Sequence, residues 1–405
     1  MRRRSSPLTR LAGAFAATVL AATALVTAAA PAQAATLTQV TGFGSNPGNL
    51  AMYAYRPDGL PAGAPAVVLL HGCTQNAAGY VADSGWQKYA DLWKFALIVP
   101  QQSTANQALT CFNWFTEGDV TRGQGEALSI RQMVSHATST YGLDGSRVFV
   151  SGLSAGGAMS AVMLATYPEV FAAGSVIAGL PYRCSPPAST SVCQYSGVDR
   201  TPAAWGDLVR AAYSGYTGRR PRVAIWHGTS DSTVVPANAV ESRDQWTDVL
   251  GVSQTPTSTS SLPAGTSLEV YGDDAVRLYR VAGMGHGTPV DPGAGTDQCG
   301  TATSYFLDTI CSTYRDARFF GLDGGTTPTP SPTLTTPPTA SPTSTATPAP
   351  TCVTASNYAH VVAGRAYQSG GYAYALGSNQ RMGLYNTFYT STLKQTAPAN
   401  WVVGC

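Results

Sequence analysis

Gly152-Leu153-Ser154-Ala155-Gly156 follows a β-like run, residues 147–150, and precedes a helix-like run, residues 158–167. A strand, a sharp turn and a helix in that order are what a nucleophile elbow requires. Its small residues relieve crowding at the strained turn and leave room for a substrate carbonyl. The pattern predicts Ser154 as a nucleophile. Because the motif can arise by chance in a chain with 42 glycines, the prediction depends on partner residues elsewhere.

The rest of the large N-terminal part alternates between strand-like and helix-like segments. Continuous apolar runs resemble buried parallel strands at residues 66–70, 96–99, 147–150, 174–178, 223–226 and 276–281. Helix-like segments cover residues 85–93, 125–140, 158–167, 237–250 and 304–320. This alternation predicts an α/β fold, with a mostly parallel sheet and helices on both of its faces. Sites in such sheets gather at the carboxyl ends of the strands.

A serine nucleophile needs a base within hydrogen-bond reach and a carboxylate to orient that base. In strand–elbow–helix hydrolases the chain order is Ser, acid, His. His286 lies in the loop Gly283-Met284-Gly285-His286-Gly287, just past the predicted strand 276–281. We predict that His286 is the general base and acid. The alternative is a loop histidine without a catalytic role.

The orienting acid is predicted to be Asp231. It lies five residues beyond the predicted strand 223–226, in a turn-forming segment where it can meet a histidine from the next strand end. There it would hold the imidazole tautomer and stabilise the imidazolium. Ordinary solvation accounts better for the other nearby carboxylates, those of Asp244, Asp248, Asp273 and Asp274.

Two backbone N–H groups are expected to form the oxyanion hole. One is that of Ala155, which follows the nucleophile, and the other is that of Cys73 in the loop His71-Gly72-Cys73-Thr74-Gln75. A Cys73–Cys111 bridge would hold this loop rigid. His71 precedes the donor, so we expect it to shape the hole and not to act as a second base.

The remaining histidines do not suggest a metal site. His136 falls within a predicted helix, His227 beside a strand end, and His360 near the C-terminus. No Cys-x-x-Cys pair with neighbouring histidines occurs. We therefore expect neither a metal nor a cofactor.

The N-terminus predicts export. Met1-Arg2-Arg3-Arg4 precedes an apolar stretch at residues 11–30, which ends in Pro31 and the small-x-small pattern Ala32-Gln33-Ala34. This is typical of a secretory signal peptide, residues 1–34; a transmembrane anchor is the alternative. We expect a secreted, extracellular protein without a membrane association after cleavage.

An exported chain with eight cysteines favours disulfides. The cysteines fall into four local couples, and proximity in the sequence suggests the bridges Cys73–Cys111, Cys184–Cys193, Cys299–Cys311 and Cys352–Cys405.

Charge is sparse and nearly balanced: 11% of residues are charged, and the formal net charge is +2. These values give no support to a polyanionic partner such as a nucleic acid. A neutral, polar surface suits a protein that works against an uncharged insoluble material.

Composition changes after Asp323. Residues 324–351 contain eight Pro and eleven Thr, which is typical of an extended linker without a core. We therefore predict a catalytic domain at residues 35–322, a Pro/Thr-rich linker at 323–351, and a small module at 352–405. A disulfide between its two terminal cysteines is expected to stabilise this module.

The motifs described above, together with Cys111-Phe112-Asn113-Trp114-Phe115, resemble those of the extracellular short-chain-length polyhydroxyalkanoate (PHB) depolymerases. The resemblance is to the catalytic type whose oxyanion loop precedes the lipase-like box. It implies an α/β-hydrolase fold and a serine esterase that cleaves poly(3-hydroxybutyrate) or related polyesters through an acyl-enzyme on Ser154. The same superfamily includes secreted feruloyl and acetylxylan esterases, which are the alternative.

The small module is similar to the polyester-binding module of those depolymerases, which implies an insoluble polyester surface as the partner. Eight aromatic residues are candidates for adsorption, and we expect about half of them to build the module's own core: Tyr358, Tyr367, Tyr372, Tyr374, Tyr385, Tyr389, Phe388 and Trp401. A carbohydrate-binding module would also use exposed aromatics. In the catalytic domain Trp114 either lines the acyl-chain groove or packs in the core.

The alternative from a different functional class is a non-catalytic surface-binding protein. We expect the protein to be a monomer.

Overall fold

The computed structural model describes residues 1, 35–185, 189–324, 352–363, 365–369, 371–386, 388–397 and 400–405. The predicted signal peptide after Met1 and most of the predicted linker lie outside these residues. The chain divides into two compact units, Met1–Pro332 and Thr333–Cys405, which are described separately.

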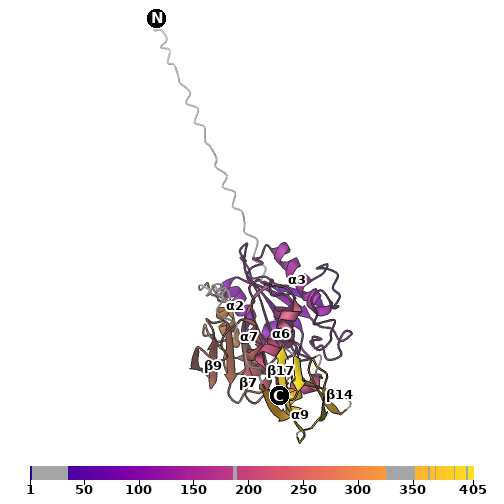
Figure 1. Cartoon of the computed structure of the whole chain (residues 1–405). Coiled ribbons are helices and arrows are strands. Elements are labelled where there is room, and N and C mark those ends of the chain that lie inside the picture. Colours follow the sequence, from indigo (N-terminus) through magenta and orange to yellow (C-terminus); the bar gives the residue numbers. More distant parts are fainter. Residues whose placement is uncertain are drawn as a thin grey trace. The chain divides into compact units, whose positions relative to one another are not determined.

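A ten-stranded sheet forms the centre of the first unit (Figure 1). Its strand order is β1 (Thr38–Val40), β2 (Ala51–Tyr55), β4 (Ala96–Gln101), β3 (Ala66–Leu70), β5 (Val148–Leu153), β6 (Phe171–Ile177), β7 (Arg222–Gly228), β10 (Val276–Val281), β9 (Thr266–Tyr271) and β8 (Ser258–Leu262). The strands from β4 to β10 in this order are parallel to one another, and the outer strands pair antiparallel. The six strands predicted from apolar runs are the parallel centre, so the predicted α/β class is confirmed.

Consecutive residues of a strand point to opposite sides of the sheet, so the continuous apolar runs make both faces apolar. Helices cover each of these faces. In β3, Val68 and Leu70 belong to one hydrophobic cluster, whereas Val67 and Leu69 belong to another. The first cluster contains residues of α3 (Gly125–Tyr141), α4 (Ala155–Thr166), α6 (Pro202–Ala212) and α7 (Ala237–Val249). The second contains residues of α1 (Ala77–Ser84), α2 (Trp86–Trp93) and α8 (Ser312–Phe319). A third, smaller cluster includes Cys193 of α5 (Thr190–Tyr195).

The helix predicted at residues 304–320 is wrong in its first half. Residues Phe306–Asp308 form β12, which pairs in parallel with β11 (Thr288–Val290). The helix α8 begins only after Cys311, whose Sγ accepts a hydrogen bond from the N–H of Tyr314. Cys311 is also bridged to Cys299. Long-range strand pairing therefore overrides the helix-like pattern of this segment.

The described residues of the second unit form two small antiparallel sheets and one helix. One sheet has the order β13 (Cys352–Ser356), β17 (Thr390–Ala397) and β18 (Asn400–Val403), and the other β14 (Ala366–Ser369), β15 (Tyr372–Ala375) and β16 (Arg381–Leu384). The helix α9 (Asn357–Val362) follows β13. Among its described residues the buried hydrophobic cluster contains Ala375, Leu393 and Trp401, and a disulfide joins Cys352 to Cys405.

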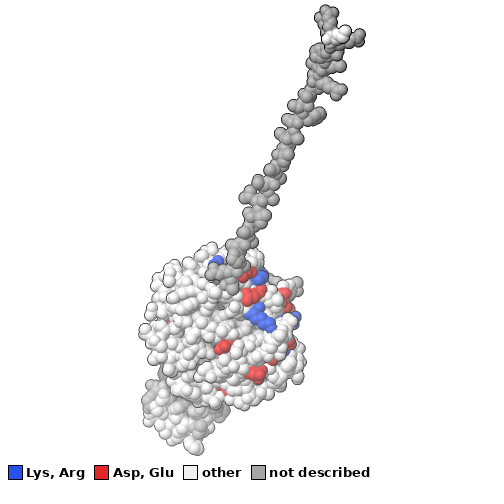
Figure 2. Space-filling view, turned by 180° about the vertical axis from the view of Figure 1, so that it is seen from behind, with Lys and Arg blue, Asp and Glu red and all other residues white. Residues whose placement is uncertain are grey.

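The structure pairs all eight cysteines in the four couples suggested by the sequence. Three of these bridges lie in the first unit. In the described parts of the chain, each helix is too short or too polar to span a membrane. The surface in Figure 2 carries few charged side chains, and acidic and basic ones are interspersed on it.

Candidate active site

Ser154 occupies a sharp turn between β5, which ends at Leu153, and α4, which begins at Ala155. Its φ of 57° lies in the left-handed region, where residues other than glycine are uncommon. The N–H of Ser154 donates to the carbonyl of Ile177 at 2.9 Å, which holds the turn against β6. A Cβ atom at Gly152 would stand 2.4 Å from the carbonyl oxygen of Gly156, so the spacing of glycines in the motif is a packing requirement.

Asp231 and His286 meet beyond the carboxyl ends of β7 and β10, which are neighbours in the sheet. The Nδ1 of His286 lies 2.8 Å from Oδ2 of Asp231. Because the carboxylate accepts, Nδ1 carries the proton, and Nε2 is left free to act as a base. His286 is 10% exposed at its side chain, and the Asp231 side chain is fully buried.

The Asp231 carboxylate is satisfied from several sides. Its Oδ1 accepts from the N–H groups of Thr233 and Val234, each at 2.9 Å. His227 lies 3.4 Å from Oδ2, and its Nε2 also donates to the carbonyl of Val234 at 2.8 Å. Burial alone would raise the pKa of Asp231, but hydrogen bonds from His227 and His286 lower it below its usual range. Asp231 is therefore ionised whenever the protein is folded near neutral pH.

Close backbone packing brings together the loop that carries Asp231 and the loop that carries His286. A Cβ atom at Gly228 would stand 2.2 Å from the carbonyl oxygen of Met284, so only glycine allows the His286 loop to approach. The N–H of Ser230 donates to that same carbonyl at 3.0 Å, and the N–H of Gly283 donates to Oγ1 of Thr229 at 2.8 Å. Asp231 and His286 are thus held on two cross-linked loops.

The loop after β3 has the features expected of an oxyanion loop. Cys73 is half-buried and bridged to Cys111, and among the described residues its N–H meets no acceptor. His71 donates through Nδ1 to the carbonyl of Gly72 at 2.8 Å, and its Nε2 accepts from the N–H of Gln102 at 3.1 Å. Because a trans peptide sets its C=O and N–H in opposite directions, fixing the Gly72 carbonyl also fixes the direction of the Cys73 N–H.

His71 is fully buried, and burial lowers its pKa to about 4. It is therefore neutral near pH 7, in the tautomer that its two partners require. This supports the expectation that His71 shapes the loop and does not act as a second base. The N–H of Ala155 belongs to the first turn of α4 and has no acceptor within the helix.

Glu126 and Gln102 form a buried network beneath this loop that the sequence analysis missed. The Nε2 of Gln102 donates to Oε1 of Glu126 at 2.5 Å and to the carbonyl of Cys111 at 3.1 Å. The Oε2 of Glu126 accepts from the N–H of Asn113 at 2.8 Å. Glu126 is fully buried, and burial raises its pKa to about 8. The network ties the segment around Cys111 to the residue that holds His71.

Trp114 packs in the interior. It is 6% exposed and shares a cluster with Ala155, Ala158, Leu180 and Trp205. Its ring meets that of Phe115 edge-on, with 5.5 Å between centroids. The core-packing alternative is therefore the better description of most of its surface, and the shared cluster includes Ala155 of the elbow.

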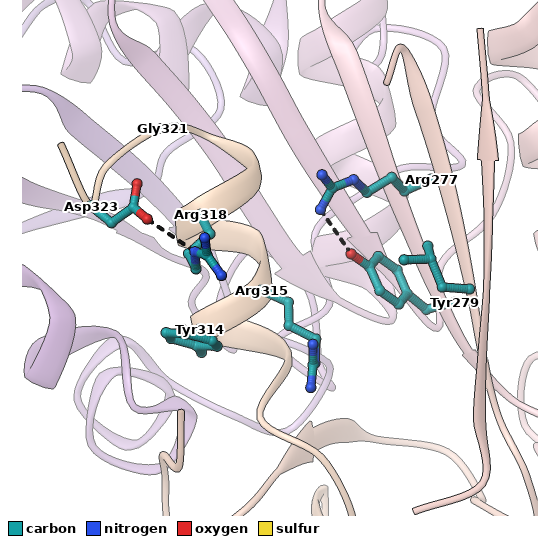
Figure 3. A pocket seen from close by; sticks show the side chains of 8 residues that line it. Arg277, Tyr279, Tyr314, Arg315, Arg318, Gly321 and Asp323 are labelled. Carbon is teal, nitrogen blue, oxygen red and sulfur yellow. Dashed lines mark hydrogen bonds and ion pairs between the residues drawn. The ribbon is translucent and has the colours of Figure 1, made fainter. Parts of the chain in front are cut away.

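Neither the pocket beside α8 nor a metal-binding cluster forms part of the predicted active site. The pocket in Figure 3 lies between α8 and strands β9 and β10 and includes none of the predicted site residues. Arg277 there pairs with Asp274, and Arg318 with Asp323 at 3.0 Å. In the described ranges no cluster of three or more His, Cys, Asp or Glu side chains could hold a metal ion.

Comparison with known proteins identifies similar chains. Residues 50–267 match the family model described as esterase PHB depolymerase. The chain is 51% identical over 312 residues to poly(3-hydroxyalkanoate) depolymerase C of Paucimonas lemoignei, which covers 76% of this chain and 75% of that protein. It is 40% identical over 276 residues to feruloyl esterase B of Neurospora crassa, covering 66% and 93%.

A solved acetyl xylan esterase from Aspergillus awamori superposes with a TM-score of 0.62 at 33% identity. The match covers 71% of this chain and 99% of that structure. The similarity therefore extends through the α/β unit, and the predicted α/β-hydrolase fold is confirmed.

Proposed function

This chain belongs to the esterase PHB depolymerase family, and on that premise we propose that it is a secreted serine esterase that hydrolyses poly(3-hydroxybutyrate) or related short-chain polyhydroxyalkanoates. The observation that carries the proposal is the 51% identity to the depolymerase of Paucimonas lemoignei over 76% of the chain. The identity to the feruloyl esterase of Neurospora crassa is 40% over 66% of the chain.

In the proposed reaction, the Oγ of Ser154 attacks the ester carbonyl while Nε2 of His286 removes its proton. The 2.8 Å contact with Asp231 supports this role, because it holds the proton on Nδ1 and stabilises the imidazolium that forms. The C–O bond to the leaving group then breaks while the imidazolium of His286 protonates the leaving alkoxide oxygen, so an alcohol departs and an acyl-enzyme forms on Ser154. Water, activated by His286, hydrolyses that intermediate and frees a carboxylic acid.

The N–H groups of Cys73 and Ala155 are proposed to stabilise the oxyanion of each tetrahedral intermediate. Support comes from the N–H of Cys73, which meets no acceptor among the described residues, and from the position of Ala155 in the first turn of α4, where the positive end of the helix dipole favours negative charge. No step requires a metal or a cofactor. Trp114 is proposed to contact the substrate only through the small part of its surface that is exposed.

Residues 352–405 of the second unit are proposed to adsorb the enzyme to the insoluble polyester, and residues 323–351 are proposed to link them to the catalytic domain. Four of its aromatic side chains are exposed by more than a third: Tyr358, Tyr367, Phe388 and Tyr389. Trp401 lies in the unit's small core. We also propose that the protein is exported by removal of residues 1–34 and acts as a monomer.

The second candidate function is a feruloyl or acetylxylan esterase, which the TM-score of 0.62 to a solved acetyl xylan esterase favours. One experiment separates the two. Wild type and Ser154→Ala are incubated with purified poly(3-hydroxybutyrate) granules, feruloylated xylan and acetylated xylan. Release of soluble 3-hydroxybutyrate by wild type alone supports the proposal, whereas release of only ferulate or acetate contradicts it.

A further inference from the structure

The pocket beside α8 has no role in the mechanism above. It encloses about 260 Å³ between α8 and strands β9 and β10. Arg315 and Arg318 line it from α8, and Arg277 and Tyr279 line it from β10 (Figure 3). The rest of its lining consists of Leu268, Tyr314, Gly321 and Asp323. We refer to it as the arginine pocket.

Carboxylates of the chain neutralise two of the three arginines. Arg277 donates to both oxygens of Asp274, through Nε at 2.6 Å and through Nη2 at 2.9 Å. Arg318 donates through Nε to Oδ2 of Asp323 at 3.0 Å. These ion pairs hold two guanidinium groups in place and offset their charge. The remaining positive charge of the lining is that of Arg315.

Arg315 has no carboxylate of this chain as a partner. Every Asp and Glu of the sequence belongs to the residues that the structure describes, and the ion pairs that these residues form do not include Arg315. Its side chain is half-buried, and its buried Nε meets no hydrogen-bond acceptor in the described part of the chain. A buried cationic donor without an acceptor is costly, and an oxyanion in the pocket would supply both the acceptor and the opposite charge.

The hydroxyl of Tyr279 is a second donor in the same pocket. Its oxygen accepts from Nη1 of Arg277 at 3.1 Å, which leaves the hydroxyl proton available. Tyr279 is 1% exposed, and its ring stacks on that of Trp226 with 3.7 Å between centroids, so the ring is held in place. A guanidinium and a phenol that can both donate to the same ligand therefore line one cavity.

We propose that the arginine pocket binds a small oxyanion, a carboxylate or a phosphate, through the guanidinium of Arg315 and the hydroxyl of Tyr279. A guanidinium can donate to two oxygens of such an anion in parallel, and these charge-assisted hydrogen bonds are stronger than neutral ones. The bound anion would join α8 to β10 and stabilise the first unit. The inference is independent of the proposed function, because the pocket contains no residue of the mechanism.

The test measures the melting temperature of the full-length protein at pH 7 in sodium phosphate, sodium 3-hydroxybutyrate and sodium chloride at matched ionic strength. Chloride controls for the screening that all three salts share. In wild type, phosphate, 3-hydroxybutyrate or both should raise the melting temperature along a saturating curve, as binding to the folded state requires. The two titrations distinguish a phosphate ligand from a carboxylate ligand.

Arg315→Gln should remove the saturating rise. Tyr279→Phe keeps the stacked ring but loses the hydroxyl donor, so it should weaken the apparent affinity about tenfold. In chloride alone, Arg315→Gln should be at least as stable as wild type, because it removes a cation that has no carboxylate partner.

Arg131→Gln is the matched control. Arg131 is also a half-buried arginine of a helix, but it lies on α3, outside the pocket. This variant should retain the full rise. The proposal is overturned if wild type shows no saturating rise, or if Arg315→Gln retains the rise in full. An equal loss of stability by Arg315→Gln in all three salts would also overturn it, because Arg315 would then support the fold without binding an anion.

Discussion

A Cβ atom built on Gly156 would stand 2.1 Å from the carbonyl oxygen of Leu70. The first turn of α4 therefore lies directly against the end of β3, the strand that leads into the oxyanion loop. The nucleophile and the proposed oxyanion donor are held together by this contact between two backbones.

Gly156→Ala should consequently destabilise the protein and abolish hydrolysis. The added methyl group meets backbone atoms, which cannot move aside as a flexible side chain would, so the loss of unfolding free energy should be at least about 1–3 kcal/mol. Thermal unfolding and esterase assays measure both effects. Gly145→Ala is the matched control, because a Cβ there meets only Cγ2 of Thr138 at 3.5 Å. A Gly156→Ala protein with wild-type stability and activity would contradict this account of the elbow.

Asp231→Asn should reduce kcat by about 10³- to 10⁴-fold while leaving the fold intact. The amide retains an oxygen for the N–H groups of Thr233 and Val234, but its NH₂ group would face Nδ1 of His286 and disfavour the required tautomer. Steady-state kinetics with a soluble ester and circular dichroism measure the two properties. Asp244→Asn, on α7, should have no such effect on kcat. If Asp231→Asn retains near-normal turnover, another carboxylate must orient the histidine.

The sequence led to Ser154, Asp231 and His286 because their chemistry depends on chain order and on the ends of apolar strands, both of which can be read along the chain. The contact between Asp231 and His286 came from the structure, and the roles of all three residues are still predictions. Glu126 and Gln102 could not be found in this way. Glu126 reads as an ordinary acidic residue in the first turn of a helix, and its burial depends on how segments from different strands meet.

The helix predicted over residues 304–311 was wrong because the pairing of β12 with β11 is a long-range interaction that local periodicity does not report.

Glu126→Ala should lower kcat for a soluble ester about tenfold or more and leave KM nearly unchanged. Without this carboxyl group, Gln102 loses a partner at 2.5 Å and the Asn113 N–H loses its acceptor, so the segment that holds His71 and Cys111 loosens. The oxyanion donor would then be less well placed, which affects the transition state more than substrate binding.

Met133→Ala provides the control for that experiment. Met133 is fully buried on the same helix, and its side chain belongs to a hydrophobic cluster and not to the hydrogen-bond network of Glu126. It should cost stability without a selective loss of kcat. Equal kinetic effects in the two variants at matched stability would show that Glu126 supports the fold in general and not the oxyanion loop.

Stability should fall as the pH rises from about 4 to about 8, and His71, whose pKa burial lowers to about 4, opposes this fall below about pH 6.5. Burial raises the pKa of Asp316 to about 7 and that of Glu126 to about 8, so the folded protein retains protons that the unfolded chain releases in this window. Asp231 has the opposite effect, at lower pH. Its lowered pKa stabilises the fold above about pH 4, and that contribution is lost on further acidification.

Asp316→Asn should flatten this dependence. Its side-chain oxygen can still accept from Nε1 of Trp226, as Oδ1 does now at 2.8 Å, but it has no proton to lose. The melting temperature measured at pH 5 and pH 8 should therefore differ less than in wild type. Asp207→Asn, an exposed carboxylate on α6, should leave the difference unchanged. An unaltered slope in Asp316→Asn would assign the pH dependence to other groups.

Phe388→Ala should weaken adsorption to poly(3-hydroxybutyrate) granules without lowering hydrolysis of soluble esters. Phe388 is 88% exposed, and the Oδ1 of Asn386 accepts from the N–H groups of both Phe388 and Tyr389, which orders the backbone that presents these two rings. An apolar ring held outward in this way contributes contact area to a solid at a low entropic cost. Binding isotherms on granules measure the effect. Tyr195→Ala, which truncates an exposed aromatic residue of α5, is the control.

Since the small core of the second unit does not include Phe388, Phe388→Ala should leave the stability of that unit unchanged. Wild-type adsorption by Phe388→Ala would move the polymer-binding surface to the exposed tyrosines of the unit, Tyr358, Tyr367 and Tyr389, which single alanine substitutions would then test.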